Sequence, residues 1–243
     1  MLALISLLTV SISHAQAEGC EVTNAGLLAQ LPTPAVIVLG ERRGLWPDLR
    51  RAEKLARKLA RDRPVTVALQ AVAADRQPIL DRYAAGELAD SDLPELLGWS
   101  QGWTMDYSDY QDLVAGADWG GTVLAVGHPY EARPADAVAP MPPGYFTVLL
   151  DGIGEHAMPV ELEGPFATNT AWLDHRMAAS AVQGWSGEGV LLILVDRLHN
   201  EGGLGVSWQV QQLTSAPVHN VLLAEANTPC YAGDLVWKDA LGG

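Results

Sequence analysis

The chain is short of basic residues. It has 15 lysines and arginines against 29 aspartates and glutamates, a formal net charge of −14 over 243 residues. A nucleic-acid-binding protein needs a basic stripe, and the one basic cluster here, between Arg50 and Arg63, lies on a single predicted helix. We therefore exclude nucleic acid as a partner. The acidic balance favours solubility and says little about the fold.

The chain also has only two cysteines, Cys20 and Cys230. Two cysteines alone do not make a structural zinc site. In an oxidising compartment, a disulfide between them would join the N-terminal segment to the C-terminal one. Two free thiols, or one lipidated and one free cysteine, are the alternatives.

Charge is missing from the first part of the chain. Residues 1–17 are largely apolar and end in Ala15-Gln16-Ala17, the small-residue pattern of a signal peptide cleaved after Ala17, although no lysine or arginine precedes the apolar part. That part is too short to span a bilayer comfortably. We expect an exported single domain of residues 18–243, periplasmic or secreted. An outer-membrane lipoprotein anchored through Cys20 is the second choice, because Glu18 stands where such a signal needs a small residue.

Several enzyme motifs are absent. No serine lies in a glycine-flanked turn after a strand, which argues against a Ser-His-Asp hydrolase. No glycine-rich phosphate loop with its lysine is present, and no closely spaced histidines suggest zinc. His128 and His156 are isolated, and we interpret both as polar surface groups.

What the chain does have is long apolar runs. Residues 35–39 and 190–195 are uninterrupted, as in strands that are covered on both faces of a sheet. A helical apolar stripe over 47–61 separates the first run from another strand at 64–70, and this order predicts a parallel pair with a right-handed crossover. The fold class is therefore α/β, a single domain with a mostly parallel central sheet flanked by helices. Further strands are expected at 122–126, 218–223 and 235–237.

The remaining segments carry weaker patterns. A weak alternation over 145–150 predicts a strand, and the proline-rich residues 133–144 predict a surface excursion. The composition of residues 151–165 predicts a loop. The dense aromatic residues from Trp99 to Tyr110 predict core or a pocket wall. Helices are expected near 25–31, 76–83, 91–97, 109–117 and 169–183.

Polar residues follow the apolar strands. Glu41 and its two arginines end the first run, and Asp196, Arg197 and His199 end the second. Ligands of open α/β sheets bind at the carboxyl ends of the strands, so we expect these groups to converge, with Gln70 joining them. The alternative is an ordinary strand-to-helix turn and a hydrogen-bonded loop histidine.

Several segments resemble one family in their order and spacing. They are residues 36–41, 63–69 and 75–88, then Trp99, Trp103, Tyr107 and Tyr110, then Asp174, Met177 and Ala178, and finally the strand leading to His199 and Gly205-Val206. Together they resemble the ChaN-like haem-binding uptake family, part of the Tiki superfamily, over residues 34–215. The resemblance implies haem binding and iron acquisition at the bacterial envelope. Related branches are metal-dependent hydrolases.

The chain departs from the family pattern at its histidines and at one carboxylate. Arg43 stands where the family usually has a histidine, and residues 46–50 lack the further histidines expected there. Gln70 replaces a glutamate and Asp196 a glycine, whereas His199 is kept. Arginine stays protonated and cannot ligate a metal, and glutamine cannot act as a general base. The resemblance therefore implies the scaffold without most of its metal-site chemistry.

The arginines suggest a different use of this edge. Arg42, Arg43 and Arg197 can make charge-assisted bonds to carboxylates, such as the propionates of haem. The competing interpretation is that Arg43 pairs with Glu41 or Asp196 and only fills a degenerate site. An axial ligand of haem would be His199 or one of two tyrosines, Tyr107 and Tyr110, with the Trp99–Tyr110 segment lining an apolar slot.

The sequence thus predicts an exported haem-binding protein that takes part in haem and iron uptake. We favour a protein without enzymatic activity. Its partner would be haem or another anionic small ligand, with an envelope transport component and a second copy as further candidates. No residue is assigned as catalytic or metal-binding, and the ligand-binding candidates are Glu41, Arg43, Gln70, Tyr107, Tyr110, Arg197 and His199. A non-catalytic envelope interaction protein is the alternative, and a metal-dependent hydrolase using Glu41 and His199 ranks last.

Overall fold

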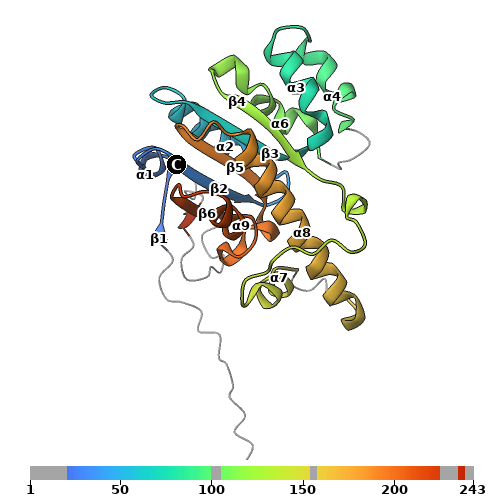
Figure 1. Cartoon of the computed structure of the whole chain (residues 1–243). Coiled ribbons are helices and arrows are strands. Elements are labelled where there is room, and N and C mark those ends of the chain that lie inside the picture. Colours follow the sequence, from blue (N-terminus) through green and yellow to red (C-terminus); the bar gives the residue numbers. More distant parts are fainter. Residues whose placement is uncertain (1–20, 100–104, 154–157, 225–234, 239–243) are drawn as a thin grey trace, which may run out of the picture.

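The computed structural model describes residues 21–99, 105–153, 158–224 and 235–238. The predicted signal peptide, Cys20, Cys230, Trp103 and His156 lie outside these ranges. One sheet runs through the described residues in the order β1-β7-β6-β2-β5-β3-β4, and all its neighbouring strands are parallel (Figure 1). The predicted α/β fold is confirmed. The strands are β1 (Glu21–Val22), β2 (Ala35–Glu41), β3 (Val65–Ala73), β4 (Thr122–Gly127), β5 (Val190–Asp196), β6 (Val218–Ala224) and β7 (Leu235–Lys238).

The two apolar runs of the sequence lie side by side at the centre of the sheet. β2 pairs with β5 from Ala35 opposite Val190 to Glu41 opposite Asp196, and it pairs with β6 on its other edge. Helices cover both faces of these strands, so every residue of β2 is buried. This explains why neither run alternates apolar with polar residues.

The helices form two layers around the sheet (Figure 1). One core cluster joins α2 and α6 to one face of the sheet, through residues such as Ile37 and Leu55. A second cluster joins α8 and α9 to the other face, through residues such as Val38 and Met177. The described helices are α1 (Ala25–Leu28), α2 (Trp46–Leu59), α3 (Gln77–Ala84), α4 (Leu93–Leu96), α6 (Tyr107–Val114), α7 (Tyr145–Ile153), α8 (Val160–Gly184) and α9 (Val206–Leu213). Among them, none has the length and apolar character needed to cross a membrane.

Two predicted elements are wrong. Residues 145–150 are not a strand but the start of α7, whose buried residues Tyr145, Val148 and Leu149 have helical spacing. The region 151–165, predicted as a loop, includes the last turn of α7 and the first turns of α8. Glu161 and Glu163 suit a helix N-terminus, where negative charge is favourable, although Pro165 lies inside the helix. The glycine and proline content of the segment concealed this start.

The end of β3 is irregular, and this irregularity shapes the edge of the sheet. The β3–β4 register runs regularly to Leu69 opposite Ala125 and resumes at Ala73 opposite Gly127, so residues 70–72 of β3 bulge against Val126 alone. β3 therefore continues beyond Gln70, where the prediction ended it. Such a bulge bends a strand and re-aims its side chains. Here it turns Gln70 toward the end of β5.

Candidate functional site

The predicted convergence of polar groups at the carboxyl edge of the sheet is observed. Glu41 ends β2 and is only 5% exposed. The Tyr110 hydroxyl donates to Glu41 Oε1. The backbone N–H of Gly44 donates to Glu41 Oε2 at 2.7 Å, in a turn where Gly44 takes the left-handed φ of 70°. Burial of the carboxyl raises the pKa of Glu41 to about 7.

The arginines at this edge are paired with carboxylates. Arg43 Nε lies 2.7 Å from Asp196 Oδ2 and so joins the end of β2 to the end of β5. Arg42 binds the buried Asp48 at the start of α2, with Nε 2.9 Å from Oδ2. Arg197 pairs with Glu201 one helical turn later. The arrangement matches the alternative in which Arg43 neutralises Asp196.

His199 lies in a buried polar triad. Its Nδ1 is 2.6 Å from Asp174 Oδ1, and the Tyr145 hydroxyl donates to Asp174 Oδ2 at 2.7 Å. Burial by itself would lower the pKa of His199, but the Asp174 carboxylate outweighs it and holds that pKa above the ordinary value. The triad joins the loop after β5 to α7 and α8.

The described aromatic residues between positions 99 and 110 pack largely inside the protein. Trp99 and Tyr110 are both buried in the core on the α2 face, with ring centroids 5.2 Å apart. Tyr107 meets Trp99 edge-on at 5.3 Å, and its hydroxyl is buried without a hydrogen-bond partner among the described residues. Neither tyrosine lines the cavity at the ends of β3 and β4. The described aromatic residues of the segment thus belong mainly to the core, which was one of the two interpretations of the sequence.

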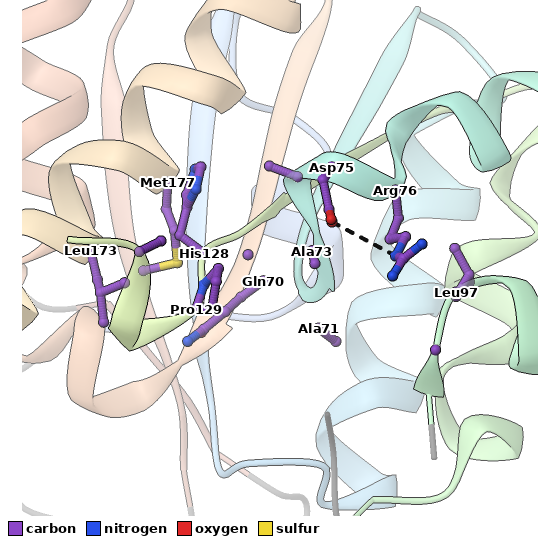
Figure 2. Close-up of a pocket in the computed structure, with 14 residues that line it drawn as sticks. Gln70, Ala71, Ala73, Asp75, Arg76, Leu97, His128, Pro129, Leu173 and Met177 are labelled. Atoms are coloured by element: carbon purple, nitrogen blue, oxygen red, sulfur yellow. Dashed lines mark ion pairs between the residues drawn. The ribbon is translucent and has the colours of Figure 1, made fainter. Parts of the chain in front are cut away.

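A cavity of about 640 Å³ opens beside the polar cluster, where β3 and β4 end (Figure 2). The bulge of β3 and the short 3-10 helix Ala74–Arg76 form one wall, and α8 contributes another. Figure 2 shows His128, Leu173 and Met177 on one side of the cavity, and Arg76 and Leu97 on the other. The lining is mainly small and apolar, and it consists of Gln70, Ala71, Ala73, Ala74, Asp75, Arg76, Leu97, Gly98, Gly127, His128, Pro129, Ala132, Leu173 and Met177.

Gln70 belongs to both the polar cluster and the cavity. The β3–β5 ladder ends at Leu69 opposite Leu194, and the Asp196 N–H donates instead to Gln70 Oε1 at 2.6 Å. Of the seven ligand-binding candidates, Gln70 alone lines the cavity. Glu41, Arg43, Arg197 and His199 are outside its lining, at or just after the ends of β2 and β5.

His128 was interpreted as a surface group, and the structure corrects this. It follows β4, lines the cavity, and packs against Trp172 with centroids 6.1 Å apart. Its Nε2 lies 3.2 Å from Ser180 Oγ, and burial lowers the pKa of His128 below its ordinary value, which favours the neutral ring. The strand-end rule that singled out Glu41 also applies to Gly127-His128 and could have found it. Arg76 and Met177 lie in segments that resemble the ChaN-like family, but no strand-end position singled them out as site residues.

The cavity falls largely within a stretch that matches a known family. Residues 27–133 match the family described as haem-binding uptake, Tiki superfamily, ChaN. The resemblance to the ChaN-like family is confirmed. The ChaN-like segment holds β2, β3 and β4, and all of the cavity lining except Leu173 and Met177. No curated protein was found to match the chain.

Solved structures share the fold of this chain. A structure that describes cofacial haem binding to ChaN of Campylobacter jejuni has a TM-score of 0.64 at 20% identity, covering 79% of this chain and 82% of that one. The type III effector HopBA1 has a TM-score of 0.52 at 11% identity, covering 88% and 91%. RRSP, a MARTX toxin effector domain from Vibrio vulnificus, has a TM-score of 0.52 at 16% identity, covering 91% of this chain and 40% of that one. At these identities the likeness establishes the fold.

In the described part of the chain, no three His, Cys, Asp or Glu side chains are placed to hold a metal ion together. The chemistry that this edge offers is an apolar cavity with Gln70 and Arg76 as hydrogen-bond donors and Asp75 beside Arg76.

Proposed function

We propose that the chain is an exported haem-binding protein that takes part in haem and iron uptake at the bacterial envelope, without catalytic activity. The observation that carries the proposal is the cavity at the ends of β3 and β4, built almost wholly from the segment that matches the ChaN-like family. The structural relative from Campylobacter jejuni, described as binding haem, supports the same ligand.

The residues of the cavity fit the organic part of haem. Small-ligand sites have volumes of about 300–1,000 Å³, are mostly apolar, and hold few polar groups. Leu97 and Leu173 supply apolar surface for a porphyrin ring, and Arg76 supplies a positive charge for a propionate. Among the described residues, the other ionisable side chains that line the cavity are Asp75, beside Arg76, and His128.

The absence of catalysis is proposed from the substituted positions. Arg43 and Gln70 stand where the resemblance implies a histidine and a glutamate, and Arg43 is held by Asp196. Neither side chain can accept a proton as a general base. A hydrolase would have to rely on Glu41 and His199, which are both buried.

Haemin titration of the purified chain tests the binding proposal. We expect a saturable Soret band at one or two haems per chain. Ala132→Trp should fill the cavity and weaken binding, whereas Ala135→Trp, three residues further along the same exposed segment and outside the lining, should not. Weak partitioning without saturation, equal in both variants, would leave the scaffold as an envelope interaction protein with another partner.

Export is tested separately, on the chain recovered from expressing bacteria. The predicted signal peptide supports release of residues 18–243, and the mass of the mature chain measures this cleavage. A mature chain that begins at Cys20 with added lipid mass would instead support the lipoprotein alternative.

A further inference from the structure

The side chain of Gln70 has a fixed orientation at the cavity. Its Oε1 accepts the hydrogen bond from the Asp196 N–H at 2.6 Å, the one hydrogen bond that the described residues give this side chain. An N–H donor requires the amide oxygen, so the two N–H groups of Nε2 face away from Asp196. Because Gln70 lines the cavity, these two donors are available to a ligand there.

Arg76 offers a second donor group at the mouth of the same cavity. Its side chain is 45% exposed, and its ion pair with Asp75 is long, with Nε 3.7 Å from Oδ1. That distance exceeds a hydrogen bond, so an entering carboxylate can take the guanidinium N–H groups. Figure 2 shows Arg76 across the cavity from His128 and Met177, which places a cationic group and an apolar wall on opposite sides.

The side chains that could ligate iron are hydrogen-bonded elsewhere or buried. His128 Nε2 contacts Ser180 Oγ on α8, and its ring packs on Trp172. Met177 lines the cavity but is only 1% exposed. The axial candidates from the sequence lie outside the lining: His199 is held by Asp174, and Tyr110 donates to Glu41. Within the described residues, the cavity thus fits the carboxylates and the ring of haem better than its iron.

We infer that the cavity recognises a tetrapyrrole by its carboxylates, through the Gln70 amide and the Arg76 guanidinium, and by its apolar ring, with no iron bond from the cavity lining. The inference rests on the proposed haem-binding function and specifies its ligand class. It also gives the glutamine a role. A glutamate at this position would present a second acceptor where glutamine presents two donors, and it would repel a carboxylate ligand.

Three probes separate the ring, the carboxylates and the iron. They are haemin, metal-free protoporphyrin IX and the dimethyl ester of protoporphyrin, each titrated at pH 8 by absorbance and by quenching of tryptophan fluorescence. We expect the dissociation constants of haemin and metal-free protoporphyrin to agree within about threefold, because the iron adds no bond from the lining. The ester should bind about tenfold more weakly or worse, because its carboxylates no longer accept charge-assisted hydrogen bonds.

Matched variants assign the carboxylate contacts. Gln70→Glu keeps an acceptor for the Asp196 N–H, so the fold is preserved while the donors are lost. It should weaken the binding of haemin and of metal-free protoporphyrin about tenfold and leave the affinity for the dimethyl ester unchanged. Gln183→Glu, on the exposed end of α8 outside the lining, controls for the added negative charge.

Arg76→Ala should weaken the binding of haemin and of metal-free protoporphyrin about threefold or more. Arg82→Ala removes a similarly exposed arginine, paired with Glu87, and should leave the binding of both unchanged.

The outcomes separate this inference from the proposed function. If haemin binds tightly and metal-free protoporphyrin binds ten times more weakly, iron ligation dominates: the inference is overturned and haem binding stands. If all three probes bind equally and Gln70→Glu changes nothing, the carboxylate contacts are refuted. If no probe binds to saturation, both the proposed function and the inference fail.

Discussion

Arg43 Nε lies 2.7 Å from Asp196 Oδ2 and thereby bridges the carboxyl ends of the two central strands, β2 and β5. The arginine side chain is 62% exposed and the aspartate side chain 17% exposed. The arginine end of the pair is therefore largely solvated. The arginine neutralises the carboxylate of Asp196, the last residue of β5. Its position outside the cavity lining separates it from Arg76.

We first predict that Arg43→Ala has little effect. Solvated ion pairs contribute about 0–1 kcal/mol, so the free energy of unfolding should fall by less than about 1 kcal/mol. Haemin affinity should stay within twofold, because Arg43 does not reach the cavity. Urea denaturation and haemin titration measure the two effects. A tenfold loss of haemin affinity in a folded Arg43→Ala protein would move the ligand from the cavity to the ends of β2 and β5.

The second prediction concerns pH and Glu41. Burial raises the pKa of this carboxyl from 4.5 to about 7, so between these values the folded chain holds a proton that the unfolded chain has released. The free energy of unfolding therefore falls as pH rises from about 4.5 to about 7, by up to about 3 kcal/mol for this group alone. Urea denaturation at pH 5 and pH 8 measures the fall.

Glu41→Gln is the control for this pH dependence. Its oxygen can still accept from the Tyr110 hydroxyl, although the contact with the Gly44 N–H is lost. The variant should be less stable at pH 5 and should show a smaller fall toward pH 8 than the parent. Parallel profiles for the two proteins would mean that Glu41 is ionised throughout this range.

The third prediction concerns the buried triad. Asp174→Ala leaves His199 and the Tyr145 hydroxyl without their carboxylate, and the loss of one partner of a buried pair costs about 3–5 kcal/mol. Tyr145→Phe removes one hydrogen bond and leaves the pair intact, so it should cost about 1–2 kcal/mol. Urea denaturation at pH 6 measures both. Equal losses in the two variants would show that Asp174 and His199 gain nothing from each other.

The α/β fold could be predicted because its central strands are buried on both faces. That burial produces the uninterrupted runs in β2 and β5, and the same rule located the polar strand ends that meet at Glu41 and Asp196. The pairing of Arg43 with Asp196 could be stated only as one alternative, because the sequence offered Arg43 two carboxylates, Glu41 and Asp196, at the ends of the two strands. The α7 helix was missed because a short apolar run with a weak alternation fits a strand as well as one helical face.

The cavity could not be predicted, because it arises from a contact between two strands. Its opening depends on the bulge of residues 70–72 against Val126, and on a side chain that takes over a backbone hydrogen bond at Asp196. Neither feature has a local pattern in the sequence. Gln70 was singled out by its strand-end position, whereas Arg76 and Met177 reach the cavity from separate elements that are adjacent only after folding.

The bulge itself supplies the last prediction, at Gly127. A Cβ atom there would lie 2.2 Å from the Gln70 carbonyl oxygen and 3.0 Å from that of Val72, so β3 would have to move. Gly127→Ala should therefore lower the free energy of unfolding by about 1–3 kcal/mol, and it should weaken porphyrin binding because the bulge positions Gln70.

Gly184→Ala is the control for the Gly127→Ala variant. Its Cβ would meet only the end of the Leu124 side chain, at 2.7 Å, which can change rotamer. That variant should lose less than about 1 kcal/mol and bind normally. If the two variants bind haemin equally and are equally stable, the bulge does not position the Gln70 side chain.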